Sequence, residues 1–234
     1  MHELPPVSAI ADVLALGGSD GWLTPPLRPV VAPDGAVSGR AVTVQLRAVP
    51  EGGGLGELQR LLSGDLSGSV VVIAGAVPVG GAVWGEILSR AARAAGAAAV
   101  LVDGFVRDRT AMAAEGLPVY ATDEAVVGPA GRAAVVAVGV PVTIGGCEVA
   151  PGDVVVGDAG GVVRVASDAS AAVLDDARRY AEAEARVLDR LAAGETLVDA
   201  YTSKRDAVAA LEAELVQRST GGGSVEVSGR TESG

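Results

Sequence analysis

The hydrophobic pattern of residues 69–104 predicts a strand, a loop, a helix and a second strand. Ser69–Ala74 is a short apolar run rich in β-branched residues, which is typical of a buried strand. The glycine-rich segment Gly75–Gly85 predicts a loop, and Glu86–Ala95 carries apolar residues at helical spacing. Ala97–Val102 predicts a second buried strand that breaks at Asp103. We therefore expect parallel strands joined by a right-handed crossover.

This geometry predicts that Arg107 and Asp108 face the glycine-rich loop, because loops after parallel strands emerge at one sheet edge, where ligands bind. Backbone N–H groups near a helix N-terminus can hold a carboxylate or phosphate. An arginine can fork onto an anionic oxygen, and an aspartate can bind a hard divalent cation. The alternative is a plain turn with a surface Arg–Asp pair.

The first part of the chain alternates between helical and extended patterns. Val7–Leu16 predicts a helix with Ser8 as a candidate N-cap. Trp22–Pro33 is proline-rich and predicts an irregular segment, whereas Gly39–Ala48 predicts a strand. Further short elements are predicted, namely helices at Gly56–Leu62 and Arg109–Glu115 and strands at Val119–Tyr120, Ala133–Val138 and Val140–Ile144.

A hairpin is predicted next, with Val154–Val156 and Val162–Val165 as its strands. Its loop contains Asp158, which is either a turn-forming residue or a site residue. Together with the preceding elements, the hairpin completes an α/β domain over residues 1–166.

Two helices are predicted to follow over residues 167–218, packed on the core or on a neighbouring subunit. The first, from about Asp168 to Ala193, has Ser167 as its candidate cap. The second, Lys204–Arg218, has Ser203 and Asp206 as a candidate capping box. Residues 219–234 are polar and rich in glycine and serine, and we expect them to be disordered.

The charge and residue usage of the 234-residue chain exclude several function classes. Its net charge of −11 argues against nucleic acid as a partner, which needs a basic face. No apolar run is long enough to cross a membrane, and the N-terminus lacks the pattern of a signal peptide, so we expect a cytoplasmic protein without membrane partners. Cys147 has no second cysteine with which to form an internal disulfide.

The scarcity of histidine and lysine narrows the chemistry further. His2 is the only histidine, which argues against a Ser–His–Asp triad or a structural zinc site. Lys204 is the only lysine, and it lies in a predicted C-terminal helix, away from any core Schiff-base position. An enzyme of this composition works with arginine, carboxylates, backbone amides and a metal.

Several segments together resemble the RraA-like family, which includes 4-hydroxy-4-methyl-2-oxoglutarate aldolases and the regulator of RNase E activity A. The similarity extends from about residue 5 to about residue 200. It is carried by VSAIADVL (7–14), SGRAVTV (38–44), GGAVWGEILSRAARAAGAAAVLVDGFVRD (80–108), LPVYA (117–121) and VTIGGCEVAPGDVVVGDAGGVVRV (142–165).

The resemblance implies a swivelling β/β/α fold with a C-terminal helical extension, assembled as homotrimers or hexamers with sites near subunit interfaces. The aldolases of the family are class II pyruvate aldolases that also decarboxylate oxaloacetate with Mg²⁺ or Mn²⁺. By position, Asp108 matches the metal-binding aspartate and Arg107 the arginine that contacts the pyruvyl oxygens. The stretch Gly80, Gly81, Ala82, Val83 and Trp84 matches the segment whose amides hold the substrate carboxylate.

The sequence also departs from the family pattern. Family aldolases usually carry an acidic residue in the glycine-rich loop and often another shortly after the Arg–Asp pair. Here Ala74–Trp84 contains no acidic residue, and Thr110–Met112 stands where the family's second acidic residue is often found. Asp108 is therefore expected to be the only direct protein ligand of the metal, with water completing the coordination shell. The main prediction is a metal-dependent lyase acting on a 2-oxo acid. The alternatives are a catalytically silent binding protein and, from the apolar Val77–Val79, an enzyme for a less polar substrate.

Overall fold

The computed structural model describes residues 3–24 and 26–221, with side chains as far as Arg218. Its helices are α1 (Val7–Leu16), α2 (Gly56–Leu61), η1 (Val77–Val79, a 3-10 turn), α3 (Glu86–Ala94), α4 (Arg109–Glu115), α5 (Ser170–Ala192), α6 (Leu197–Ala200) and α7 (Thr202–Gly221). Its strands are β1 (Arg28–Val31), β2 (Val37–Ala48), β3 (Ser69–Ala74), β4 (Ala82–Trp84), β5 (Ala99–Val106), β6 (Val119–Glu124), β7 (Ala133–Val138), β8 (Val142–Ile144), β9 (Cys147–Val149), β10 (Val154–Asp158) and β11 (Gly161–Val165).

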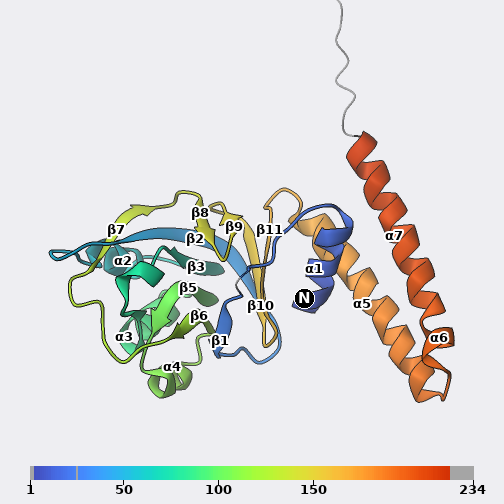
Figure 1. Cartoon of the computed structure of the whole chain (residues 1–234), viewed down its shortest axis with the longest axis horizontal. Coiled ribbons are helices and arrows are strands. Elements are labelled where there is room, and N and C mark those ends of the chain that lie inside the picture. The colour runs from blue at the N-terminus through green and yellow to red at the C-terminus, as the bar shows by residue number, and fades with distance from the viewer. Residues whose placement is uncertain (1–2, 25, 222–234) are drawn as a thin grey trace, which may run out of the picture.

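The described strands form a nine-stranded mixed sheet and a separate β8–β9 hairpin (Figure 1). Along the large sheet the order is β1-β6-β5-β3-β2-β10-β11, with β4 paired to β5 and β7 paired to β2. The central strands β2, β3, β5 and β6 are parallel, as the sequence predicts for β3 and β5. This is the expected α/β fold with a C-terminal helical extension.

The central strands bury both of their faces, which explains their nearly continuous apolar sequences. On one face, Val71, Ile73 and Val102 pack with residues of α2, α3 and α4, among them Leu58 and Met112. The opposite face of the same strands packs against the β8–β9 hairpin and neighbouring segments. The aliphatic chain thus builds two core layers around one sheet.

Strand β5 continues through Asp103 and Gly104, so the break predicted at this point is wrong. Gly104 has no side chain, and a Cβ there would lie only 2.6 Å from the Cβ of Ala76, so the glycine allows η1 to pack on the strand. The Ala76 amide donates to the Asp103 carbonyl (3.0 Å). Burial raises the pKa of the Asp103 carboxyl, against the opposing hydrogen bond from Gly75. The longer strand carries the chain directly to Arg107.

Other differences from the predictions concern short strands. The segment predicted as irregular contains β1, which pairs antiparallel with β6 at the sheet edge. Edge positions tolerate its proline because one side of the strand needs no partner. The glycine-rich loop contains η1 and β4, and the described strands also include β9 and a longer β6 than predicted.

The predicted helix caps are wrong at three places. Helix α1 begins after Pro6 without a side-chain cap, so Ser8 lies inside the helix, and the Val7 amide donates to the carboxylate of distant Asp158 (3.0 Å). Helix α5 begins after Ala169 without a side-chain cap. Ser203 lies inside α7, where its hydroxyl donates to the Ala200 carbonyl, because α6 precedes almost directly.

The β10–β11 hairpin is confirmed, and Asp158 closes it. Its carboxylate accepts from Gly160 (2.7 Å) as well as from Val7, while its carbonyl accepts from the Tyr120 hydroxyl (3.0 Å). These contacts assign Asp158 to the turn and to the first turn of α1. The hairpin thereby fixes α1 against β10 and β11, where both contribute to a third apolar cluster.

The C-terminal helices extend from this third cluster, and Figure 1 shows α5 and α7 side by side, away from the sheet. Lys204 ties them together: its ammonium lies 2.8 Å from Glu184 and 4.6 Å from the ring centre of Tyr180. The buried carboxylate of Asp176 forms ion pairs with Arg179 of α5 and with Arg218 of α7. These contacts and the apolar cluster hold the extension on α1 within one chain.

The end of α7 also departs from the prediction. The helix reaches Gly221, so residues 219–221 are helical and not part of a disordered tail. Helical propensity falls only at the glycine run that begins there. The rest of the predicted tail, residues 222–234, lies outside the described residues, and the domain boundary at residue 166 stays a prediction. None of the described helices is long and apolar enough to span a membrane.

Asp153 joins several elements, which makes it a test of this architecture. Asp153 is 4% exposed, and its carboxylate accepts from Arg164 (2.7 Å), Ala150 (2.8 Å) and Ser167 (3.2 Å). We expect Asp153→Ala to lower the free energy of unfolding by about 3 kcal/mol, because it leaves a half-buried guanidinium unpaired. Chemical denaturation measures this, with exposed Asp168→Ala as the control. Equal stability of the two variants would contradict the linking role of Asp153.

Candidate functional site

Arg107 and Asp108 lie where the carboxyl ends of β4 and β5 meet. Strand β4 pairs with the last residues of β5, and the Arg107 amide donates to the Trp84 carbonyl (3.0 Å). The pair forms a common wall of two hollows. One, of about 190 Å³, is also lined by residues of β4 and the first turn of α3, and the other, of about 500 Å³, by residues 124–127 after β6. The prediction that Arg107 and Asp108 face the glycine-rich segment is therefore confirmed.

Asp108 has a left-handed backbone with φ of 63°, which is uncommon for a residue other than glycine. It precedes α4, but its carboxylate makes no capping hydrogen bond to that helix. The side chain is 48% exposed, and a Cβ on Gly85 would lie 3.0 Å from its Oδ2 atom. The backbone thus aims the carboxylate at the narrow space beside Gly85, where it is open to solvent.

The Arg107 guanidinium lies close to Gly128, and the Gly128 backbone in turn lies against Gly81. A Cβ on Gly128 would lie 3.3 Å from its Nη1 atom, and a Cβ on Gly81 would lie 2.5 Å from the Gly128 carbonyl oxygen. The guanidinium is held beside Asp108, with Nε 3.5 Å from Oδ2, and remains 46% exposed at the side chain. The sequence pattern does not mark Gly128 as a site residue, although the position of its loop after a third parallel strand is a signal that points to it.

The segment 80–84 is more structured than a free anion-binding loop. The Gly80 amide donates to the Val77 carbonyl (3.2 Å), and the Ala82 amide donates to the Val127 carbonyl (2.8 Å). Ala82, Val83 and Trp84 line the smaller hollow, and the Trp84 indole donates to buried Ser89 (2.8 Å). Gly80 and Gly81 are not among the residues that line either hollow, and the substrate-binding role of the segment stays a prediction.

The N-terminus of α3 also faces the smaller hollow. Gly85, Glu86, Ile87 and Leu88 line it, and the helix has no side-chain cap. The first amides of a helix lack intrahelical partners and carry partial positive charge. Gly85 has no side chain that would cover them. These amides and the Arg107 guanidinium therefore lie on the same hollow and suit an anion.

The other charged residues around the site are paired. Arg90 donates to Glu115 (2.7 Å) and Glu86 (3.2 Å), and Arg109 lies 3.3 Å from Glu124. The described residues contain no cluster of three or more histidine, cysteine, aspartate or glutamate side chains that could hold a metal. Asp108 alone fits a Mg²⁺ or Mn²⁺ ion bound largely by water and by a ligand, since Mg²⁺ is often held by one or two carboxylates.

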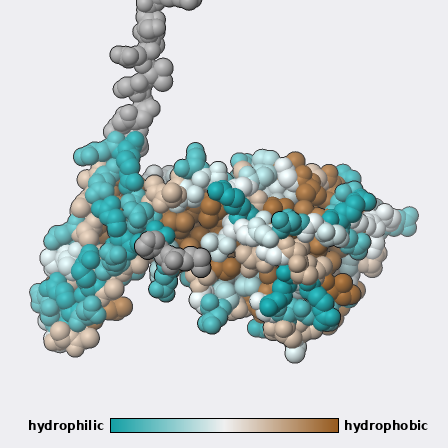
Figure 2. Space-filling model, turned by 180° about the vertical axis from the view of Figure 1, so that it is seen from behind, coloured by the Kyte–Doolittle hydropathy of each residue, from teal (hydrophilic) through white to brown (hydrophobic). Residues whose placement is uncertain are grey.

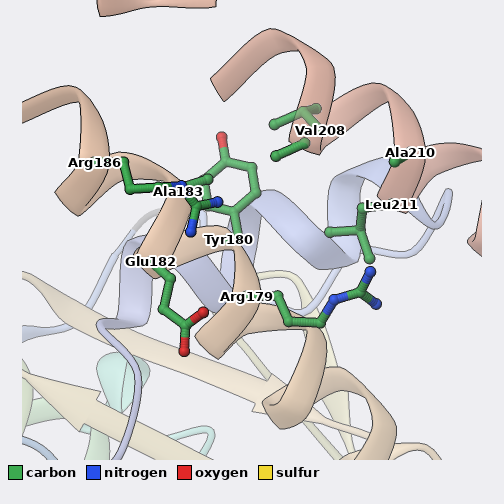
Figure 3. Close-up of a pocket in the computed structure, with 9 residues that line it drawn as sticks. Arg179, Tyr180, Glu182, Ala183, Arg186, Val208, Ala210 and Leu211 are labelled. Carbon is green, nitrogen blue, oxygen red and sulfur yellow. The ribbon is translucent and has the colours of Figure 1, made fainter. Parts of the chain in front are cut away.

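A different hollow lies between α5 and α7, far from this chemistry (Figure 3). Its volume is about 190 Å³, and its walls include Tyr180, Val208 and Leu211. The Arg179 guanidinium at its edge makes two contacts of 2.8 Å with Glu214. The hollow is a gap between packed helices, and the charge of Arg179 at its edge is neutralised by Glu214, so nothing in it indicates a ligand.

The family of the chain follows from its match to known proteins. The model of the RraA-like family, described as Aldolase/RraA, matches residues 7–164. The chain belongs to the RraA-like family. Two named sequence relatives are similar to this RraA-like protein. It is 31% identical over 184 residues to a Halalkalibacterium halodurans protein named "Putative 4-hydroxy-4-methyl-2-oxoglutarate aldolase", covering 77% of this chain and 82% of the relative. It is 33% identical over 119 residues to an uncharacterised Methanocaldococcus jannaschii protein, covering 50% of this chain and 56% of that one.

Solved structures support the same fold. An uncharacterised protein from Pseudomonas syringae superposes with a TM-score of 0.73 at 28% identity, covering 85% of this chain and 93% of its own. An unusual member of the RNase ES inhibitor RraA protein family from Streptomyces coelicolor gives a TM-score of 0.66 at 24% identity, covering 76% and 88%. The RraA-like fold predicted from the sequence is therefore confirmed.

The contact between Gly81 and the Gly128 backbone offers a test of how the site is built. We expect Gly81→Ala to lower the free energy of unfolding by about 1–3 kcal/mol, because its Cβ would overlap backbone that cannot rotate away. Chemical denaturation measures the change. Gly54→Ala is the matched control, since a Cβ at Gly54 meets nothing within 4 Å. Equal stability of the two variants would show that the loop around Gly128 can shift to accommodate the added methyl group without a cost in stability.

Proposed function

We propose that this RraA-like protein is a metal-dependent carbon–carbon lyase acting on a 2-oxo acid, by retro-aldol cleavage or by decarboxylation. The observation that carries the proposal is the convergence of the Arg107 guanidinium, the Asp108 carboxylate and the uncapped first turn of α3 on one hollow. Membership of a family that includes aldolases supports it. So does the similarity to the Halalkalibacterium halodurans protein named as a 4-hydroxy-4-methyl-2-oxoglutarate aldolase.

The residues of the chain divide the work between binding and charge stabilisation. The amides at the start of α3 bind the substrate carboxylate. Arg107 contacts the pyruvyl oxygens with its planar fork. When the bond between C3 and C4 breaks, its electron pair stays on C3 and negative charge develops on the C2 oxygen. Arg107 stabilises this charge, a water in the site removes the proton from the C4 hydroxyl in the retro-aldol reaction, and C3 is then protonated to give pyruvate.

Asp108 is the residue proposed to hold the divalent ion. Mg²⁺ or Mn²⁺ would act as a Lewis acid toward the 2-oxo carboxylate group. The left-handed backbone and half-exposed carboxylate of Asp108 suit an exchangeable ion that needs room for water and substrate oxygens. An ion enclosed wholly by protein does not fit, because the described residues offer no cluster of ligands.

The second candidate is a catalytically silent binding protein with the same fold. The observation that favours it is the absence of any acid between Ala74 and Trp84, in the segment where family aldolases usually carry one. On this alternative, Arg107 and Asp108 form a local ion pair at 3.5 Å, which at this exposure contributes about 0–1 kcal/mol.

Substitutions at Asp108 and Arg107 separate the two candidates. Asp108→Asn should abolish metal-dependent release of pyruvate from oxaloacetate while the fold remains intact, since asparagine also tolerates a left-handed backbone. Arg107→Lys should lower turnover by about 10²–10³, because lysine lacks the planar fork. The measurements are pyruvate release with and without Mg²⁺ or Mn²⁺, and metal titration by calorimetry with oxalate present.

Arg109→Lys is the matched control for Arg107→Lys, because Arg109 is the next residue in the chain and pairs with Glu124. It should retain wild-type turnover. If wild-type protein binds neither ion at millimolar concentration with oxalate, or if Asp108→Asn binds them equally well, the lyase proposal fails and the binding protein is favoured.

We also propose that the protein is a homotrimer or a hexamer. Large apolar side chains are exposed around the site, including Ile87 (80%) and Val126 (98%). Val136 and Val138 are exposed on β7, which pairs only with β2 among the described strands. An exposed apolar sheet edge is normally covered by a partner.

Light scattering tests the assembly. We expect a mass three or six times the 23.0 kDa of the chain at micromolar concentration. A stable monomer would contradict the proposal, and it would also exclude any residue of a second subunit from the site.

A further inference from the structure

We infer that Gly128 is a positioning residue for Arg107: the anchored loop after β6 bounds the space of the Arg107 guanidinium and thereby fixes its orientation. This inference rests on the proposed lyase function, in which Arg107 contacts the pyruvyl oxygens. It follows from the close approach of two glycines to the Arg107 side chain and from the hydrogen bonds that hold the loop of Gly128.

Two glycines lie close to opposite ends of the Arg107 side chain. A Cβ on Gly85 would lie 3.2 Å from Cγ of Arg107, and a Cβ on Gly128 would lie 3.3 Å from its Nη1 atom. Both distances are shorter than ordinary van der Waals contact, so this space exists because neither residue has a side chain. Between these ends, Nε of Arg107 lies 3.5 Å from Oδ2 of Asp108. The guanidinium is therefore bounded at several points although the side chain is half-exposed.

The loop that carries Gly128 is anchored to the sheet and to a neighbouring loop. Its backbone also lies against Gly81, where a Cβ would come within 2.5 Å of the Gly128 carbonyl oxygen. The anchoring hydrogen bonds run from the Ala125 amide to the Val106 carbonyl (2.9 Å), from Ala82 to Val127 (2.8 Å), from Arg132 to Pro129 (2.8 Å) and from Gly53 to Gly131 (2.7 Å). When this loop and a long arginine side chain compete for space, the side chain yields because its torsions rotate more easily.

A methyl group at position 128 would press on Arg107 alone. Among the described residues outside its own chain neighbours, only Nη1 (3.3 Å) and Cζ (3.7 Å) of Arg107 come within 4 Å of that Cβ. The backbone of Gly128 is not in the left-handed region, so alanine is tolerated there without strain. Gly128→Ala thus displaces the guanidinium by a few tenths of an ångström and leaves the fold unchanged.

Such a displacement affects turnover because the guanidinium must meet two oxygens of one ligand with its planar fork. We expect Gly128→Ala to lower kcat/KM for pyruvate release from oxaloacetate by about tenfold, with Mg²⁺ or Mn²⁺ present. Its denaturation midpoint and its mass by light scattering should equal those of the wild type. Gly54→Ala is the matched control, since a Cβ at Gly54 meets nothing within 4 Å, and it should keep wild-type kcat/KM.

A double-mutant cycle tests whether Gly128 acts through Arg107. A lysine at position 107 would end near the place of the arginine Cζ atom, which lies at an ordinary contact distance of 3.7 Å from the new Cβ. In the Arg107→Lys background, Gly128→Ala should therefore change kcat/KM by less than about twofold. Tenfold losses in both backgrounds would mean that Gly128 acts by another route, and would overturn the inference.

Binding measurements separate the guanidinium from the metal ligand. Gly128→Ala should weaken the binding of oxalate to the Mn²⁺-loaded protein about tenfold by calorimetry, and leave the affinity for Mn²⁺ alone unchanged. Gly85→Ala should weaken both, because its Cβ would lie 3.0 Å from Oδ2 of Asp108. Weaker Mn²⁺ binding in Gly128→Ala would show that the whole site is disturbed and would contradict a role confined to Arg107.

The outcomes distinguish this inference from the proposed function. If the wild type releases pyruvate and Gly128→Ala matches it in kcat/KM and oxalate affinity, the inference fails and the lyase stands. If the wild type releases no pyruvate but binds oxalate more tightly than Gly128→Ala does, the lyase chemistry fails and the positioning of Arg107 is supported. If the wild type neither releases pyruvate nor binds oxalate, both proposals fail.

Discussion

The pairing of β4 with the end of β5 is the constraint on which the candidate site depends. It joins two segments separated by a helix and brings the Trp84 carbonyl to the Arg107 amide at 3.0 Å. Because β5 is also held by β3 and β6 in a buried sheet, the position of Arg107 is set by the core of the domain. A side chain on Gly85, Gly81 or Gly128 would enter the space that Arg107, Asp108 or their supporting loop occupies. The site is thus a gap that glycines keep open beside a rigid strand.

The candidate site places the Arg107 guanidinium 3.5 Å from Asp108, while the neighbouring glutamates are paired with other arginines. Arg107 and the first turn of α3 attract an anion, whereas Glu86 and Glu124 pair with Arg90 and Arg109. Asp108 adds a carboxylate that a divalent ion would neutralise.

The C-terminal extension follows a different physical scheme. Figure 2 shows its outer surface as largely hydrophilic, with apolar atoms gathered where the extension meets the sheet. Charged side chains connect its helices: Lys204 contacts Glu184 and the Tyr180 ring, and Asp176 receives Arg179 and Arg218. Burial lowers the pKa of Lys204, but hydrogen bonds to Glu184 and Tyr180 outweigh it, so the pKa of this ammonium is raised and its charge is retained. The only lysine of the chain is thereby used for structure.

The sequence by itself determined the parallel β3–β5 unit, the β10–β11 hairpin and the convergence of Arg107 with the glycine-rich segment. These features follow from local patterns of apolar residues and glycine, and from the handedness of a crossover connection. Only the tertiary structure decided that β5 continues through Asp103, that Asp158 caps a helix far along the chain, and that Gly128 supports the guanidinium. Each of these depends on a contact between residues distant in sequence. Local propensity does not encode such contacts, because packing against another segment sets their energy.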